Sequence, residues 1–182
     1  MCKIIIGGIV GAVIAFIWQF VSWAVLPWHD ATIHQFKNQE CVAKVIKENA
    51  PVSGIYVYPH YKSDAGTQKT AMTKGPFIYT QIRLCGIDPS SPLLYITSFL
   101  TQFVGAALIS FLLLQMSHSG YGTRLLSVTI TGLIVGVLGF VPSWNWFGAS
   151  CAFTLVMIAD LIITWFLAGL FLAAYAKRKH VA

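Results

Sequence analysis

The chain has 182 residues, of which 57% are hydrophobic and only 10% are charged, against roughly 25% charged residues in soluble proteins. This composition excludes an ordinary soluble domain, because apolar side chains in such excess must cover an outer surface as well as a core. The net charge of +6 does not indicate nucleic-acid binding, since the basic residues lie in a polar loop and beside apolar runs instead of in one patch.

Four apolar segments are predicted to cross a membrane as helices. An α-helix needs roughly 20 apolar residues to cross the hydrocarbon layer, and the segments 4–26, 93–116 and 146–176 have that length. The segment 125–141 is shorter, because Pro142 is expected to end its helix. We therefore predict a membrane all-α protein that forms a single domain, a four-transmembrane-helix bundle.

The segment 27–92, between the first two spans, is predicted to be a small α/β subdomain. Asn38 is a suitable N-cap for a helix that ends near Asn49, because the residue before Pro51 resists helical geometry. The stretches 53–58 and 77–84 are rich in β-branched and aromatic residues, which is typical of strands. The subdomain is thus expected to hold one helix plus a β-hairpin.

The distribution of basic residues predicts the orientation of the chain. Lys3, Arg124 and the tail 177–179 fall on one side of the membrane if there are four spans, and the opposite turn 142–146 has no charge. By the positive-inside rule, both termini are expected in the cytoplasm and loop 27–92 in the periplasm, in a bacterial inner membrane. An interfacial belt of tryptophans is expected on that outer side, made of Trp23, Trp28, Trp144 and Trp146.

Asp160 is the acid that the sequence places inside a predicted span. A carboxyl group near the middle of a bilayer costs at least ~2.5 kcal/mol to insert, so it should face protein or water. Gln19 and Gln102 lie at similar depth in the first two spans and are the expected partners of Asp160. This intramembrane polar cluster could relay a proton or cation, or anchor a ligand. It could equally hold helices together through hydrogen bonds.

Two further sets of residues are candidates for a site in the outer loop. His29, Asp30 and His34 offer imidazole and carboxylate groups, so a metal site is possible there, although a polar turn at the end of a span would look the same. Cys41 and Cys85 are the two cysteines of the loop, and one disulfide between them would suit an oxidising compartment. Two unbonded cysteines remain the alternative.

Pairs of glycines four residues apart predict close helix packing. Gly7 and Gly11 in the first span show this spacing, and so do Gly132 and Gly136 in the third, with Gly139 one turn further. Such small-xxx-small pairs let helix backbones approach closely, within one chain or between copies.

The chain resembles two groups of membrane proteins, one in the order of its spans and loops and the other in three short stretches of sequence. One span, a long outer loop with strands and two cysteines, and three closely spaced spans resemble the layout of claudin-like tetraspan proteins, although the signature Trp-x-x-Trp-Cys-Cys is missing. The stretches 23–29, 54–59 and 75–77 are similar to small four-span bacterial inner-membrane proteins. That resemblance implies a location in the membrane and no activity.

Three classes of function stay open from the sequence. The first is a non-enzymatic accessory or scaffold component that contacts the lipid bilayer and a membrane partner or a second copy. The second is a small binder or transporter of a solute, proton or metal that uses Asp160. The third is a membrane-embedded enzyme acting on lipid or quinone. The sequence carries no Walker, His-Glu-x-x-His or Gly-x-Ser-x-Gly motif, so no catalytic residue and no cofactor are predicted.

Overall fold

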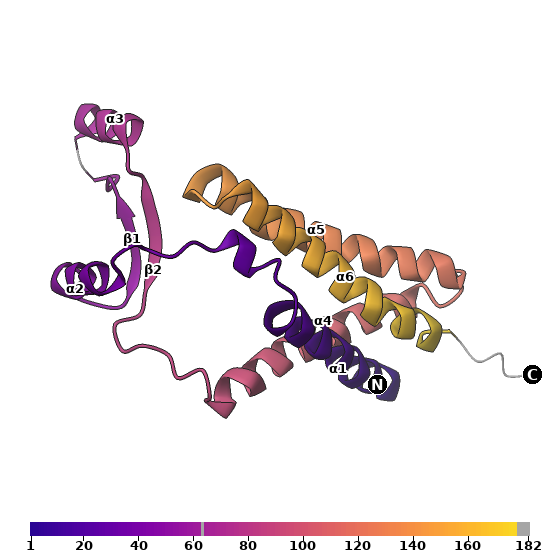
Figure 1. The fold of residues 1–182 in the computed structure, drawn as a ribbon. Helices are drawn as coiled ribbons and strands as arrows, with labels where there is room; N and C mark the ends of the chain where they lie inside the picture. Colours follow the sequence, from indigo (N-terminus) through magenta and orange to yellow (C-terminus); the bar gives the residue numbers. More distant parts are fainter. Residues whose placement is uncertain (63, 178–182) are drawn as a thin grey trace, which may run out of the picture.

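The computed structural model describes residues 1–62 and 64–177, so Arg178 and Lys179 of the basic tail lie outside the described residues. Within this part of the chain, four helices are long and apolar enough to cross a membrane, as expected of an integral membrane protein. They are α1 (Cys2–Ala24), α4 (Pro92–Gln115), α5 (Tyr121–Phe147) and α6 (Cys151–Tyr175) (Figure 1).

Helix α6 contacts all three of the other long helices. It packs along α5 on one side and along α1 on the other, and α1 in turn packs along α4. A smaller contact joins α4 to α6, where the Trp165 ring lies over Gly105. The core between these helices is apolar and includes Ala106, Leu113 and Leu172. A closed four-helix bundle stays a prediction, but α6 is the helix on which the others converge.

Glycines lie where the helices approach one another most closely. A Cβ atom on Gly11 would lie 2.8 Å from the Ala106 Cβ of α4, and one on Gly132 would lie 2.7 Å from the Leu161 carbonyl oxygen of α6. Contacts this short leave no room for a methyl group, so these helix pairs depend on glycine. Gly139 differs, because a Cβ there would meet no atom within 4 Å.

The predicted end of the third span at Pro142 is wrong. Helix α5 continues through Pro142 to Phe147 and ends at Gly148, whose φ of 79° is left-handed. Proline inside a spanning helix is tolerated where neighbouring groups compensate for the backbone hydrogen bond that it removes, and α5 ends only where the amides of Gly148 and Ala149 both donate to the Ser143 carbonyl. The turn is therefore 148–150, and α6 begins at Cys151 instead of at 146.

The outer loop contains the predicted helix and hairpin and a second helix that was not predicted. Helix α2 (Gln39–Asn49) begins after Asn38, whose side chain accepts a hydrogen bond from the Cys41 amide at 2.9 Å. Strands β1 (Gly54–Tyr58) and β2 (Ile78–Ile82) pair antiparallel. The expectation of a single helix is wrong, because α3 (Ala65–Lys74) follows the N-cap Asp64. Its sequence has no apolar face that would have revealed a helix.

The hairpin and its helices form an outer cap, defined here as residues 34–87, which extends away from the four long helices (Figure 1). One aromatic contact links the two parts: the rings of Tyr79 in β2 and Phe147 at the end of α5 lie 4.4 Å apart. Neither α2 nor α3 contains a buried residue. The cap therefore has little core of its own.

Arg124, at the start of α5, ties together the ends of three helices. Its side chain is 3% exposed. Its Nε donates to the Ala173 carbonyl of α6 at 2.7 Å, and its Nη1 donates to the carbonyls of Ser117 and Ser119, just after α4. The guanidinium thus satisfies carbonyls at helix C-termini, where the helix dipoles favour a positive charge.

Replacing Arg124 by methionine should lower the free energy of unfolding by about 2 kcal/mol, because buried carbonyls lose a charged donor while the apolar stem is kept. Titration with SDS in mixed micelles measures this. Ser127→Ala is the matched control in α5, since that hydroxyl is exposed and bonds only the Thr123 carbonyl of its own helix. Equal stability of the two variants would contradict the assigned role of Arg124.

Candidate functional site

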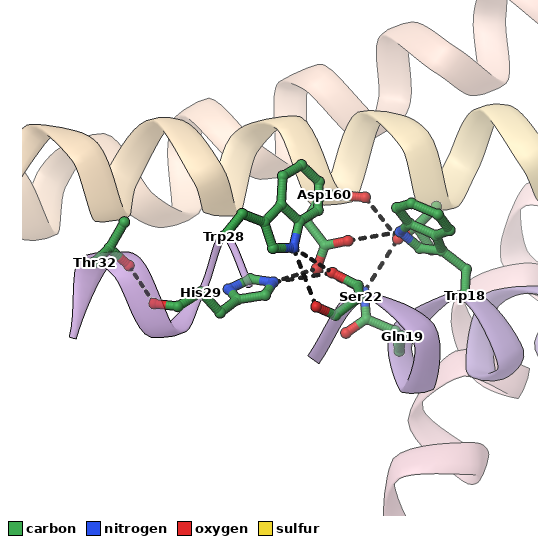
Figure 2. A network of polar contacts seen from close by, with 8 residues as sticks. Trp18, Gln19, Ser22, Trp28, His29, Thr32 and Asp160 are labelled. Atoms are coloured by element: carbon green, nitrogen blue, oxygen red, sulfur yellow. Dashed lines mark hydrogen bonds and ion pairs between the residues drawn. The ribbon is translucent and has the colours of Figure 1, made fainter. Parts of the chain in front are cut away.

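Asp160 is the middle of a buried cluster of polar side chains that joins α6 to α1. It is the tenth residue of α6 and is 1% exposed. Its Oδ1 accepts a hydrogen bond from the Trp18 indole at 2.6 Å, and its Oδ2 accepts one from Gln19 Nε2 at 3.3 Å. The same Oδ2 lies 3.4 Å from Nε2 of His29 (Figure 2). Together with Ser22, these residues are called the polar centre below.

Helical spacing explains how α1 and α6 supply this cluster. Trp18 and Ser22 are four residues apart and Gln19 lies beside them, so one stripe of α1 faces α6. Asp160 and Thr164 are also one turn apart, and Gln19 Nε2 donates to the Thr164 hydroxyl at 3.1 Å. Thr164 returns its own proton to the Asp160 carbonyl at 2.7 Å. The amide of Gln19 therefore bonds the side chains of both Asp160 and Thr164.

His29 reaches the polar centre from the connection after α1. The chain folds back at Pro27 and forms a short 3-10 helix, η1 (Asp30–Thr32). His29 is 1% exposed, and its ring stacks on Trp23 with centroids 3.8 Å apart and planes at 8°. Trp28 meets the same ring edge-on at 5.5 Å. Two tryptophans thus hold the imidazole in place beside the carboxyl group.

Ser22 organises the same turn. Its Oγ lies 3.0 Å from His29 Nε2, and the Trp28 indole donates to both its carbonyl and its hydroxyl at 3.1 Å. The Thr32 hydroxyl donates to the His29 carbonyl at 2.8 Å, which closes the 3-10 turn (Figure 2). Segment 27–33 is therefore attached to α1 and α6 mainly through one histidine and one tryptophan.

The two ring nitrogens of His29 have different surroundings. Nε2 faces the Asp160 carboxyl group and the Ser22 hydroxyl. Nδ1 is buried and has no hydrogen-bond partner among the described residues. A neutral imidazole with its proton on Nε2 donates toward Asp160 and leaves only a lone pair unpaired at Nδ1, whereas a proton on Nδ1 would leave a buried donor unpaired. We infer the Nε2–H form when the ring is neutral.

The core on the side of Asp160 that leads to Tyr175 is apolar. Beyond Thr164, the buried residues of α6 are Trp165, Ala168, Gly169, Leu172 and Ala173. The facing part of α4 adds Ala106, Ile109 and Leu113, with the Ser110 hydroxyl bonded to its own helix. The polar centre is thus continuous with the loop at one end of the helices and closed by apolar packing at the other.

Gln102, the other expected partner of Asp160, does not join the polar centre. It is half-buried in α4, and none of the hydrogen bonds seen in residues 1–62 and 64–177 links it to Asp160. Trp18 takes the place expected for Gln102. The signal for Trp18 was present in the sequence as a polar stripe with Ser22 one turn later, but an indole in an apolar span is hard to distinguish from a lipid-facing tryptophan.

The structure does not bring His29, Asp30 and His34 together as metal ligands. No three His, Cys, Asp or Glu side chains in the described part of the chain converge as metal ligands would. Asp30 and His34 are exposed, whereas His29 turns inward to Asp160. The physical reason is that the buried carboxyl group and the stacked Trp23 ring compete for this imidazole.

The structure does not show the disulfide considered between Cys41 and Cys85. Both thiols are free and exposed in the structure. Cys41 lies in the exposed first turn of α2, and Cys85 lies in the turn after β2 beside Arg83. Of the predicted tryptophan belt, Trp23, Trp144 and Trp146 are largely exposed, but Trp28 is half-buried against His29.

A hydrogen bond to Arg83, helped by the charge of its guanidinium, lowers the pKa of the Cys85 thiol. More of this thiol is therefore ionised near neutral pH, and the thiolate is the reactive form. Iodoacetamide should label Cys85 faster than Cys41 at neutral pH, and Arg83→Gln should slow Cys85 several-fold while leaving Cys41 unchanged. The difference should vanish at high pH, where both thiols are ionised. Peptide mass spectrometry reads each site, and equal rates at neutral pH would contradict the assigned contact.

The fold and the site define a class of protein: an integral membrane protein with a histidine–carboxyl pair buried among its candidate spans. Comparison of the chain with known proteins found no matching family model, no matching curated protein and no matching solved structure.

Proposed function

We propose that this chain is an accessory membrane protein whose outer cap responds to proton binding at the His29–Asp160 pair. The observation that carries the proposal is the contact between these two titratable side chains, 3.4 Å apart and each 1% exposed. One of them belongs to a candidate membrane span and the other to the segment that leads to the cap. Adding or removing a proton there changes the contact that attaches this segment.

Charge explains why a proton matters at this place. With one proton, the pair is either a neutral histidine beside a neutral acid or an imidazolium beside a carboxylate, and its net charge is zero. Loss of that proton leaves one negative charge, and a second proton leaves one positive charge. Either charge is costly in apolar surroundings unless groups rearrange around it.

Few other ionisable groups lie on the elements around the pair. Among the described residues, α4 carries no Lys, Arg, His, Asp or Glu, and α6 carries Asp160 alone. Lys3 in α1 and Arg124 in α5 lie near the opposite helix ends. Asp30, next to His29, is exposed. The charge of the pair is therefore governed mainly by its own proton.

The unpartnered Nδ1 of His29 supports a responsive role over a merely structural one. A network that only joins helices is expected to satisfy all its buried polar atoms, and an exception needs a reason. A second proton would bind at this nitrogen. The apolar core beyond Thr164 argues against a proton path across the membrane, so we place the exchange on the loop side. The finer placement, with cytoplasmic termini and a periplasmic cap in a bacterial inner membrane, is part of the proposal and is supported by the basic residues of the flanks.

Exposed apolar side chains on the cap support the accessory part of the proposal. Phe36, Val45, Val52 and Ile55 are each more than half exposed, and the helices of the cap bury none of their residues. Large apolar side chains left exposed on a segment with little core are candidates for protein contacts. A pull-down from mild detergent should recover a stoichiometric partner or a defined homo-oligomer, and Val45→Glu should abolish this. A lone monomer in every condition would contradict it.

Hydrogen exchange in nanodiscs tests the proton response. Amides of segment 27–35 should exchange at least ten-fold faster in Asp160→Asn than in the wild type at the same pH, because His29 loses its ionic partner; ten-fold corresponds to about 1.4 kcal/mol. The wild type should show a change in protection, corrected for intrinsic rates, when the pH is varied and the pair gains or loses a proton. Gln102→Leu is the matched control and should behave as the wild type. Protection that is unaffected by pH and by Asp160→Asn would overturn the proposal.

A further inference from the structure

A groove opens between α1 and α4 beside the polar centre. Its volume is about 430 Å³, within the range of small-ligand sites. Helix α1 lines it with Phe16, Gln19, Phe20 and Trp23, and α4 lines it with Tyr95 and Ser98. These residues occupy the last two turns of α1 and the first two turns of α4, so they share the end of the helices from which the cap extends.

The lining of the groove is aromatic, with a few polar atoms and no charged side chain. Gln19 makes two hydrogen bonds, and both use Nε2 as the donor, which leaves the acceptor Oε1 available. The Tyr95 hydroxyl donates its proton to the Pro89 carbonyl at 3.0 Å, so its oxygen can accept. The exposed Ser98 adds a hydroxyl. This set suits a neutral group with hydroxyl donors and does not offer the cation that a phosphate requires.

The position of the groove points to an occupant from the membrane. Phe20 and Tyr95 are more than half exposed, so the groove opens sideways, toward lipid in the expected placement. Trp23 and Tyr95 are residues that favour the depth of lipid headgroups. A headgroup at that depth would meet Gln19, and an acyl chain would lie along Phe16 and Phe20.

We infer that the groove between α1 and α4 binds a neutral single-chain lipid with a hydroxyl headgroup, of the monoacylglycerol class, whose hydroxyl donates to Oε1 of Gln19.

Two residues that line the groove also contact the His29–Asp160 pair. Gln19 donates to Asp160, and Trp23 stacks on His29. A lipid that orders these two side chains therefore changes the surroundings of the pair, and by linkage the proton state changes the affinity for the lipid. This coupling rests on the proposed function, whereas binding of the lipid does not.

Quenching of tryptophan fluorescence by a brominated monoacylglycerol tests the inference in mild detergent. The signal of the site is the quenching that is lost in Trp23→Phe. We expect saturable quenching in the wild type, and at least ten-fold weaker binding in Gln19→Leu, which lacks the acceptor. Ser98→Phe, which fills the groove from α4 without touching the polar centre, should be equally weak. Gln102→Leu is the control in α4 and should bind as the wild type.

Three competing lipids identify the headgroup. An unbrominated monoacylglycerol should displace the probe, whereas the methyl ester of the same fatty acid, which lacks a hydroxyl, and an anionic lysophosphatidylglycerol should compete at least ten-fold less well. Quenching that does not saturate, or that is unchanged in Gln19→Leu and Ser98→Phe, would overturn the inference. Equal competition by either comparison lipid would do the same. Hydrogen exchange of segment 27–35 in lipid-free Ser98→Phe should match the wild type, which separates this test from that of the proton response.

Discussion

Replacing Asp160 by alanine should lower the free energy of unfolding by about 3 kcal/mol, the cost typical of breaking a buried pair by removing one partner. The substitution leaves the Trp18 indole, the Gln19 amide and His29 Nε2 without the oxygens that they face. All three belong to α1 or to the segment that follows it. The contact between α1 and α6 and the attachment of segment 27–33 should weaken together.

Two variants separate the charge of Asp160 from its hydrogen bonds. Asp160→Asn keeps an oxygen for Trp18, so it should be destabilised by only about 1.5 kcal/mol. Gln102→Ala, in a half-buried amide that does not contact Asp160, should lie close to the wild type. SDS titration in mixed micelles provides the ranking. If Asp160→Ala is as stable as Gln102→Ala, the carboxyl group does not hold these helices together.

Replacing Gly132 by alanine should lower the free energy of unfolding by roughly 3 kcal/mol, the upper end of the cost of overpacking. The new methyl group would lie 2.7 Å from the backbone oxygen of Leu161 and 3.0 Å from Trp165 Cβ. A backbone oxygen cannot rotate away as a side chain can, so α5 and α6 must separate. Trp165 also packs over Gly105 of α4, and the displacement should therefore spread to that contact.

Gly139→Ala is the matched control for this prediction, in the same helix. A Cβ there meets nothing within 4 Å, and alanine is favoured over glycine in a helix by about 0.5 kcal/mol. Gly139→Ala should thus be neutral or slightly stabilising under the same SDS titration. Similar stabilities for the two variants would show that α5 and α6 do not approach at Gly132 as described.

The long helices could be predicted from composition because the requirement for apolar residues in lipid is strong and repeats over some 20 positions. Their ends could not. Pro142 is ordinarily a helix breaker, but α5 continues past it and ends at the left-handed Gly148, where the amides of Gly148 and Ala149 bond the Ser143 carbonyl, so the turn and not the proline sets the end of the helix. Helix α3 was missed for a related reason, since it is a polar helix held by its Asp64 cap and not by a buried face.

The polar centre could be predicted in part. An acid in an apolar span must be satisfied, so a cluster around Asp160 with Gln19 followed from electrostatics alone. The inward turn of His29 did not, because it depends on the fold-back at Pro27 and on stacking against Trp23. Reading His29 with Asp30 and His34 as a metal set treated neighbours in sequence as neighbours in space. The pairing of Cys41 and Cys85 could not be derived either, since an oxidising compartment allows a disulfide but does not bring two thiols together.

The most direct test of the central claim is the protonation of His29 itself, measured by nitrogen NMR on ¹⁵N-histidine-labelled protein in nanodiscs, with His29→Gln identifying its signals. The proposal predicts Nε2–H when the ring is neutral, a change at Nδ1 when pH is lowered, and a different pH dependence in Asp160→Asn but not in Gln102→Leu. A spectrum of His29 that is identical in the wild type and in Asp160→Asn at every pH would contradict it.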